Sequence, residues 1–353
     1  MIAFLIVTAG ILFLYKYNVL DRADRYLDCI QEADKALAEP GETIVFTVTV
    51  VNRSFWLFPY IRASVYFPGA FELPGEEVRE ESSWQKTVSR SMMILPKGKV
   101  SFRLQAVCEK RGRYTLHDVL LQSGDSLGLS TKFFRRHSDG EIVIIPKKLV
   151  DEQLERTIGG FLGSVSVRRF IHEDPVLSAG FREYTGQEPM KQISWKQSAK
   201  GLGLMVKVPD YTADPVLCLI INTDTRAPDR EELIERTLIQ ARTVCEQLEK
   251  HRFAYRVLMN AACTGALSSA GGIGHGTGDE HYRLAMEMLG RASYACERSF
   301  GQLVQQAMEQ NDQTAGHLIL TPSFSDRLPG DLLARLSAHS GTEAVLLCGE
   351  ALL

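Results

Sequence analysis

Polar and apolar side chains alternate along much of the chain after residue 39. In Thr43–Asn52 nearly every second side chain is apolar, which is the pattern of a strand with one buried face. Similar short runs, each bounded by Gly, Pro, Asp or Asn, recur at 61–67, 99–108, 114–122 and 141–145. Several short strands separated by turn signals predict a β-sandwich domain over residues 39–147.

The pattern changes after Pro215. Val216–Ile221 is a continuous apolar run, typical of a strand covered on both faces, and a segment of helical periodicity follows from Asp229, which suits a helix cap. Strands and helices then alternate, with strands expected at 255–259, 317–320 and 344–347 and helices at 280–289, 297–309 and 329–337. This alternation predicts a doubly wound α/β domain with a parallel sheet over residues 209–353.

The first fifteen residues carry no charged side chain and would span about 22 Å as a helix. Lys16, Arg22 and Arg25 follow them, which places the positive flank on the C-terminal side. We therefore expect a transmembrane helix over 1–17 and a juxtamembrane linker over 18–38. The chain would then be a single-pass membrane protein with its soluble domains in the cytoplasm.

Two other interpretations of this start remain open. A cleaved signal peptide needs a basic region before the apolar run and a small-residue cleavage site after it, and neither is present. The run also fits the end of a longer membrane region whose upstream part lies outside this chain.

Composition narrows the class of protein. The 353 residues are enough for two domains, each with a core of its own. Forty basic side chains against 43 acidic ones give a net charge of -3, without a long Lys/Arg run, so nothing indicates a nucleic-acid partner. The seven cysteines are scattered without a close pair, which argues against a zinc knuckle or redox dithiol and favours free thiols.

Polar residues follow the first predicted strand of the α/β domain, where ligands collect in open sheets. Asn222 and Asp224 offer oxygen atoms of the kind that Mg²⁺ prefers. The alternative, favoured because only one carboxylate is present, is that they hydrogen-bond the turn. A glycine-rich stretch at 265–278 lacks the spacing of a phosphate-binding loop and predicts a mobile loop.

Catalytic motifs are missing from the sequence. It contains no H-E-x-x-H zinc motif, no G-x-S-x-G nucleophile elbow and no G-x-x-x-x-G-K-[ST] phosphate loop. We therefore expect the protein not to be an enzyme.

The stretch 181–200 mixes charged groups with Tyr184 and Trp195 at a density unusual for a linker. Its basic side chains offer donors to a carboxylate-bearing partner and its aromatic rings offer rigid contact area. The alternative is a structural clasp that pins the linker 148–208 to the α/β domain, because buried polar groups must find partners.

This stretch resembles the signature R-E-Y-x-x-G-D-D-x-R-x-I-x-W-x-x-S-A-R of the bacterial domain-of-unknown-function 58 family. Glu188, Lys191 and Lys200 keep the charge of their family counterparts, whereas Gln187 replaces an acidic residue. Residues 110–114 and 124–129 resemble that family's R-G-x-Y and D-P-x-G-L motifs, with Ser126 in place of the proline. The positions that match the signature as they stand are Arg182, Glu183, Tyr184, Gly186, Ile193, Trp195, Ser198 and Ala199.

The resemblance implies a C-terminal domain similar to von Willebrand factor type A, whose metal site uses D-x-S-x-S after its first strand. Asn222, Asp224 and Arg226 stand at those positions here, with 321–326 after a later strand, so the chain departs from the metal-binding pattern. Family members usually carry two N-terminal membrane helices, whereas one is visible here. Relatives often accompany a MoxR-type AAA ATPase, which is the partner that the resemblance implies.

Together these patterns predict a multidomain α and β chain, with an N-terminal membrane helix, a β-sandwich and a doubly wound α/β (von Willebrand factor A-like) domain. The predicted function is a non-enzymatic, membrane-anchored interaction module that acts as an adaptor for a MoxR-type AAA ATPase. The alternative is a Mg²⁺-dependent adhesion or hydrolytic module that uses Asn222 and Asp224, and no other cofactor is expected. The predicted partner-binding or clasp residues are Arg182, Glu183, Tyr184, Gly186, Glu188, Lys191, Trp195, Ser198 and Lys200.

Overall fold

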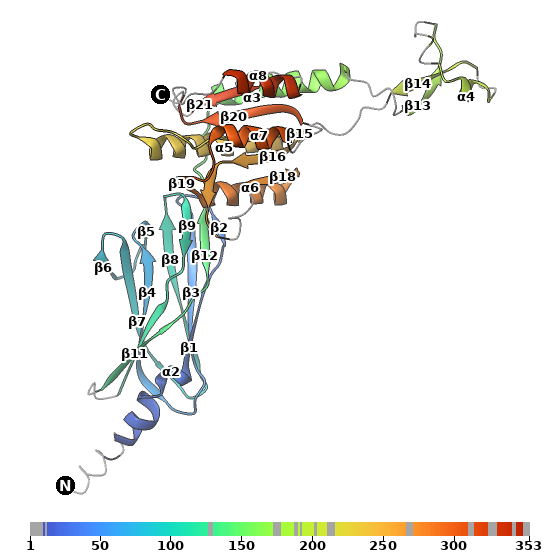
Figure 1. Cartoon of the computed structure of the whole chain (residues 1–353). Coiled ribbons are helices and arrows are strands. Elements are labelled where there is room, and N and C mark those ends of the chain that lie inside the picture. The colour runs from blue at the N-terminus through green and yellow to red at the C-terminus, as the bar shows by residue number, and fades with distance from the viewer. Residues whose placement is uncertain are drawn as a thin grey trace. The chain divides into compact units, whose positions relative to one another are not determined.

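The chain divides into two compact units, Met1–Lys147 and Lys148–Leu353 (Figure 1). The computed structural model describes residues 10, 13–125, 130–171, 178–186, 190, 193–200, 203–209, 216–265, 271–309, 314–323, 330–340 and 344–348.

Unit 1 consists mainly of antiparallel sheets. One sheet has the order β1-β3-β8-β5, with β1 at Leu27–Ala33, β3 at Thr43–Asn52, β8 at Lys99–Cys108 and β5 at Phe71–Glu72. A second has the order β11-β10-β4-β7-β6, with strands at Thr131–Arg136, Val119–Gly124, Phe58–Pro68, Gln85–Ile94 and Val78–Ser82. A small third sheet joins β2 (Leu37–Ala38), β12 (Glu141–Ile144) and β9 (Gly112–Thr115).

The core of unit 1 follows from the two-residue period of its strands. In β3 the side chains of Ile44, Phe46, Val48 and Val50 are fully buried, while those between them are only partly buried. The Phe46 ring meets the Phe67 ring of β4 edge to face, with 5.0 Å between centroids. Residues from the first two sheets therefore share one core.

The N-terminal segment packs against this core. Lys16–Leu20 forms a π-helical turn and Ala23–Tyr26 a short helix, α2. Val19, Leu20 and Ala23 have no more than 1% of their surface exposed, so these side chains are covered by protein. Residues 27–33, expected in the linker 18–38, form β1 and pair with β3 from Leu27↔Asn52 to Ala33↔Phe46.

The predicted transmembrane helix over 1–17 is wrong for its described residues, 10 and 13–17. Residues 1–9, 11 and 12 of that prediction lie outside the described residues. Within the described part of the chain, every helix is too short or too polar to cross a bilayer. This finding contradicts the predicted single-pass position in the bacterial cell membrane.

Unit 2 has a five-stranded sheet with the order β18-β16-β15-β20-β21. β15 (Val216–Ile221) is parallel to β16 (Ala254–Met259) and to β20 (Thr314–Thr321), and β21 (Val345–Cys348) is parallel to β20. β18 (Gly272–Gly276) lies antiparallel to β16 at one edge. Two further strand pairs are separate from this sheet, β13 (Ser178–Glu183) with β14 (Met205–Pro209) and β17 (Ala261–Cys263) with β19 (Ala292–Cys296).

Helices cover this sheet. The helix α5 lies against β15, β16 and β20, and α7 and α8 pack on each other. Cys218 and Ile220 of β15 contribute to the cluster under α7 and α8, which leaves the alternate side chains of the strand for the other face. The helices of unit 2 in the described residues are α3 (Glu152–Ile171), α4 (Trp195–Ser198), α5 (Arg230–Lys250), α6 (Asp279–Arg291), α7 (Phe300–Glu309) and α8 (Gly330–Ser340).

The predicted fold class is wrong. The described residues are rich in strands, which form six separate sheets, and they contain no membrane helix. A uniformly parallel, doubly wound sheet over 209–353 also does not describe unit 2, because an antiparallel strand closes one edge and β17 and β19 pair apart from the sheet.

The glycine-rich stretch accounts for part of this difference. We expected a mobile loop, whereas Gly272–Gly276 forms β18, and 266–270 lies outside the described residues. A Cβ atom on Gly272 would lie 2.6 Å from Cδ2 of Leu258, and one on Gly276 would lie 2.7 Å from Nδ1 of His281. The glycines therefore allow this strand to approach its neighbours closely.

Helix α3 forms inside the predicted linker 148–208. The Asp151 carboxylate accepts hydrogen bonds from the N–H groups of Gln153 (2.9 Å) and Leu154 (3.1 Å), which caps the first turn. The buried side chains recur at helical spacing, at Leu154, Ile158, Phe161, Leu162 and Val165.

Candidate functional site

The described residues within 178–209 form a small hairpin, which we call the Trp195 segment. β13 and β14 pair antiparallel, with Arg182 opposite Val206. Ile193 bridges to Val206 from the other side, and the Ser194 N–H donates to the Met205 carbonyl at 2.8 Å. β14 therefore lies between β13 and residue 193.

Ser198 joins the helical turn α4 to β14. Its hydroxyl donates to the Ser194 carbonyl (2.9 Å) and accepts from the Met205 N–H (2.9 Å). The Tyr184 N–H donates to the Leu204 carbonyl (2.7 Å). Gly186 has a φ of +90°, a conformation that glycine adopts without the strain that other residues incur. Ser198, Gly186 and Tyr184 of the predicted site therefore have clear local structural roles.

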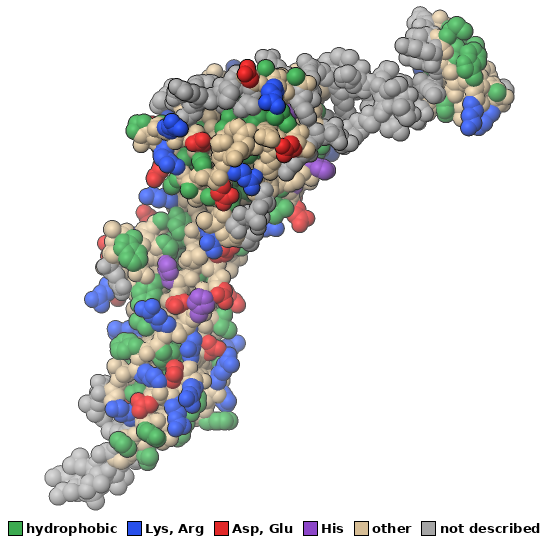
Figure 2. All heavy atoms as spheres, viewed as in Figure 1, with side chains coloured by type: hydrophobic (Ala, Val, Ile, Leu, Met, Phe, Trp, Pro, Cys, Tyr) green, Lys and Arg blue, Asp and Glu red, His purple; other side chains and the backbone are tan. Residues whose placement is uncertain are grey.

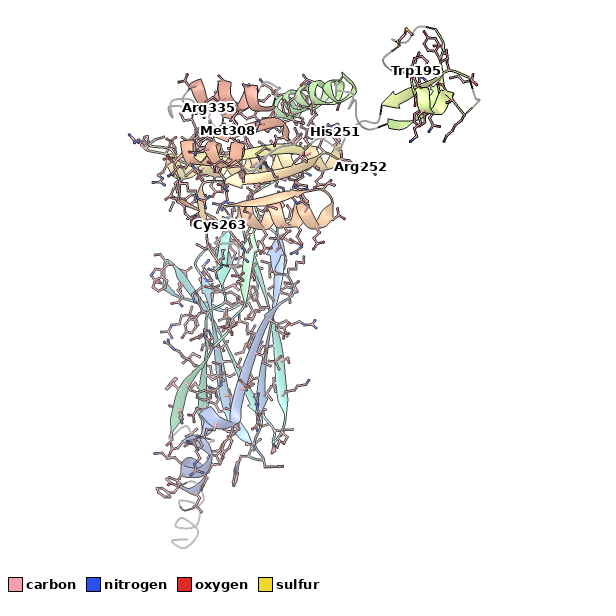
Figure 3. The ribbon with its side chains drawn as sticks, turned by 45° about the vertical axis from the view of Figure 1, so that its right-hand side comes forward. Trp195, His251, Arg252, Cys263, Met308 and Arg335 are labelled. Atoms are coloured by element: carbon pink, nitrogen blue, oxygen red, sulfur yellow. The ribbon has the colours of Figure 1, made fainter. Side chains whose placement is uncertain are left out.

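The large side chains of the Trp195 segment are exposed. Trp195 has 61% of its surface exposed, and Phe181, Met190 and Leu204 are also exposed (Figure 3). Figure 2 shows hydrophobic and basic side chains on the surface of this segment. Of the other predicted residues, Glu188 and Lys191 lie outside the described residues. The exposed charged side chains of the segment are Arg182, Glu183, Lys196 and Lys200.

The predicted residues Asn222 and Asp224 lie in a second group of polar residues, at the carboxyl ends of β15, β16 and β20. The Asn222 amide donates to Thr321 Oγ1 (3.2 Å), and Asn222 Oδ1 accepts from the Asn260 amide (2.8 Å) and the Asp224 N–H (3.0 Å). Asn260 Oδ1 accepts from both the N–H (2.7 Å) and the hydroxyl of Thr223 (3.0 Å). We call Asn222, Thr223, Asn260 and Thr321 the strand-end network, and all four are buried.

This geometry joins the strand ends to one another. Asn222 Oδ1 and Asn260 Oδ1 each accept two hydrogen bonds from protein groups, and the Asp224 side chain is exposed. Within the described ranges, no three His, Cys, Asp or Glu side chains are arranged to hold a metal ion. Residues 324–326 of the implied metal site lie outside those ranges. No observation on the described residues favours the Mg²⁺-dependent alternative.

Asn260 is absent from the predicted site although it links the network. Its sequence signal is the same as that of Asn222, because both are polar residues directly after a buried strand. Residues that follow neighbouring parallel strands meet at one edge of the sheet.

Two thiols of unit 2, Cys218 and Cys296, are not activated. Burial raises the pKa of the Cys218 thiol to about 11, so it stays protonated at neutral pH. Burial also raises the pKa of Cys296, although a hydrogen bond with Thr223 (3.3 Å between Sγ and Oγ1) acts in the opposite direction. These two thiols therefore lack the lowered pKa of a catalytic nucleophile.

No protein-family model matches the chain, and no curated protein matches it in sequence. Among solved structures, it is similar to a CARDB domain from Pyrococcus furiosus (10% identity, 33% of this chain and 91% of that chain, TM-score 0.23). It is also similar to a cohesin module from a Clostridium perfringens family 33 glycoside hydrolase (10% identity, 34% of this chain and 96% of that chain, TM-score 0.26). Salmonella alpha-2-macroglobulin shares 13% identity over 34% of this chain and 9% of that chain, with a TM-score of 0.27.

At such low TM-scores these likenesses carry no argument about function. We withdraw the von Willebrand factor A-like part of the prediction for 209–353 together with the predicted fold class, because an antiparallel strand closes one edge of the sheet and β17 and β19 pair apart from it.

Proposed function

We propose that this chain is a protein-interaction module and that the Trp195 segment is the surface that binds its partner. The observation that carries the proposal is the exposure of Trp195, a large aromatic side chain with 61% of its surface in contact with solvent. Trp and Arg are the residues most enriched among those that dominate binding energy at protein interfaces. A contiguous apolar surface with a polar rim is typical of such an interface.

The charge of the segment favours an acidic partner. Among its described side chains, the three cations Arg182, Lys196 and Lys200 stand against the single carboxylate of Glu183. Cations around an aromatic contact form hydrogen-bonded ion pairs with carboxylates, and their charge speeds the encounter with an acidic surface. The partner is therefore a protein with exposed Asp or Glu side chains around an apolar contact site.

The clasp interpretation predicts a buried Trp195, because a side chain that pins one segment to another loses its contact with water. The hairpin instead has contacts that do not use this ring. Ile193 and Val206 are buried between the strands, and Ser198 links α4 to β14. Trp195 is therefore available for a contact with another protein.

The candidate partner is the MoxR-type AAA ATPase that the sequence resemblance implies. The test is a pull-down with the full chain as bait against a cytoplasmic extract of the host, in the presence and absence of ATP, read by mass spectrometry. Recovery of a MoxR-type ATPase makes the chain an adaptor, whereas recovery of no specific protein contradicts the proposal.

Reversing two charges of the Trp195 segment is expected to weaken this binding at least about tenfold, which corresponds to about 1.4 kcal/mol. The reason is that each reversal removes an attraction to an acidic partner and adds a repulsion. The variant is Lys196→Glu with Lys200→Glu, and the measurement is the Kd at two salt concentrations. The matched control is Lys99→Glu with Arg103→Glu, a pair of exposed cations on β8. Equal affinities for the two double variants would argue against an acidic partner at this surface.

A further inference from the structure

Two connections in unit 1 run between the same pair of sheets. Residues 116–118 lead from β9 to β10, and residues 137–140 lead from β11 to β12. β9 pairs with β12, up to Thr115↔Glu141, and β10 pairs with β11 from Val119↔Arg136. The two connections therefore bridge an interruption in what is otherwise a continuous ladder between two neighbouring chain segments.

Backbone pairing across this interruption is sparse. The Leu116 N–H donates to the Gly140 carbonyl at 2.8 Å, and a Cβ atom on Gly140 would lie 2.4 Å from Cδ1 of Leu116. Side chains therefore have to hold the two connections together where the ladder is broken. The two connections line a pocket of about 560 Å³, together with residues of β4, β7, β9, β11 and β12.

The His137 imidazole lies between two carboxylates at this position. Its Nδ1 is 2.7 Å from Oδ1 of Asp118 on the other connection, and its Nε2 is 2.8 Å from Oδ1 of Asp139 on its own. An ionised carboxylate can only accept hydrogen bonds, so both ring nitrogens must carry a proton for both contacts to be favourable. The geometry therefore requires the imidazolium form.

We propose that His137 is a proton-dependent clamp that holds these two connections together and controls the opening of the pocket that they line. When the ring loses a proton, one nitrogen presents a lone pair to a carboxylate oxygen less than 3 Å away. That contact becomes repulsive, and one of the two bonds is lost. The neutral tautomer that keeps the proton on Nδ1 retains the bond to Asp118 between the connections, whereas the tautomer that keeps it on Nε2 loses that bond.

The charged groups around His137 come from all the strands that meet there. Arg113 of β9 and Glu141 of β12 form an ion pair with 2.6 Å between Nε and Oε2. Arg135 of β11 lies two residues before His137 in the sequence. Asp118 and Asp139 contact the His137 ring directly.

The sign of the pH dependence follows from the pKa. The hydrogen bond with Asp118, and then the negative charge of Asp139, raise the pKa of His137 above its ordinary value. A group whose pKa is raised on folding contributes stability that is complete below its unfolded pKa and is lost as the pH rises through its folded pKa. The clamp is therefore strongest in mildly acidic solution, where both bonds are made, and weakens as the pH rises above the raised pKa.

The test uses the full chain and two measurements. The histidine Cε1–H resonances are followed by NMR between about pH 5 and pH 9, because an imidazole titrates within this range. Amide hydrogen exchange of the peptides that contain 116–118 and 137–140 is measured over the same range and divided by the rates in His137→Gln. We expect a raised pKa for His137 that falls in Asp118→Asn, and slower exchange in the wild type only below that pKa.

The control is His117→Gln, which removes a half-buried histidine of the same connection that has no hydrogen bond to another described residue. Its exchange profile should match the wild type. If His137→Gln disturbs folding, Asp118→Asn replaces it as the reference. An unshifted titration of His137, or equal exchange in the wild type and the reference variant at every pH, would overturn the proposal.

Discussion

Trp195→Ala is expected to abolish partner binding while leaving the folded chain intact. An aromatic side chain at the centre of an interface contributes about 2 kcal/mol or more, which corresponds to a loss of affinity of about 30-fold or more. The stability should change by no more than about 0.5 kcal/mol, because the ring is exposed in the free chain and the hairpin does not depend on it. The Kd and the free energy of unfolding are the two quantities to measure.

The matched control for this variant is Trp84→Ala. Trp84 lies in the turn between β6 and β7 of unit 1 and has 69% of its surface exposed, so the same group is removed from a similar environment. We expect both stability and binding to match the wild type. A loss of more than about 2 kcal/mol of stability in Trp195→Ala alone would support the clasp interpretation instead.

Asn260→Ala is expected to destabilise unit 2 by about 3 kcal/mol. The substitution removes one donor and one acceptor from the strand-end network and leaves buried groups of Asn222 and Thr223 without these partners. A buried polar group that loses its hydrogen bond costs about 1–3 kcal/mol, and more than one group is affected here. The measurement is urea-induced unfolding, with the transition of unit 2 analysed separately because the two units need not unfold together.

Asp224→Ala is the control for the network. Its carboxylate is exposed, and the N–H that donates to Asn222 belongs to the backbone and remains in the variant. The expected change is within about 0.5 kcal/mol. If Asn260→Ala were no more destabilising than this control, the network would not stabilise the strand ends.

Elements with a clear period could be predicted from the sequence. β3 has the predicted bounds Thr43–Asn52, because alternation reports a buried face directly. The helix expected from Asp229 is α5, whose apolar positions recur at helical spacing. In both elements the buried side chains are numerous enough to give the sequence a visible period.

Elements without such a pattern were missed. α3 buries only a narrow row of side chains and contains three glycines, so composition argued for a linker although Asp151 supplies a cap. β18 consists largely of glycine, and its place in the sheet depends on the close approach to Leu258 and His281 rather than on its own side chains. The membrane prediction for 1–17 rests on fifteen residues without a charged side chain. Apolar residues that protein buries leave a similar pattern in the sequence, as Val19 and Leu20 do just after this run.

The candidate site shows the same limit. The sequence placed Asn222 at the carboxyl end of a strand, and the meeting with Asn260 and Thr321 follows from the strand order, which the sequence alone does not contain. A binding surface and a clasp contain the same residue types, so only the exposed fraction of Trp195 separates them. The hydroxyl of Ser198 reaches the Met205 N–H seven residues away, a contact that no local pattern announces.

The most direct test of the proposed function is a hydrogen-exchange footprint of the full chain, recorded alone and with the partner recovered in the pull-down. We expect the partner to slow exchange in 178–209 and not in the peptide that contains Trp84, and we expect Trp195→Ala to remove this protection. Protection confined to other parts of the chain, or protection that Trp195→Ala leaves unchanged, would contradict the assignment of the Trp195 segment as the binding surface.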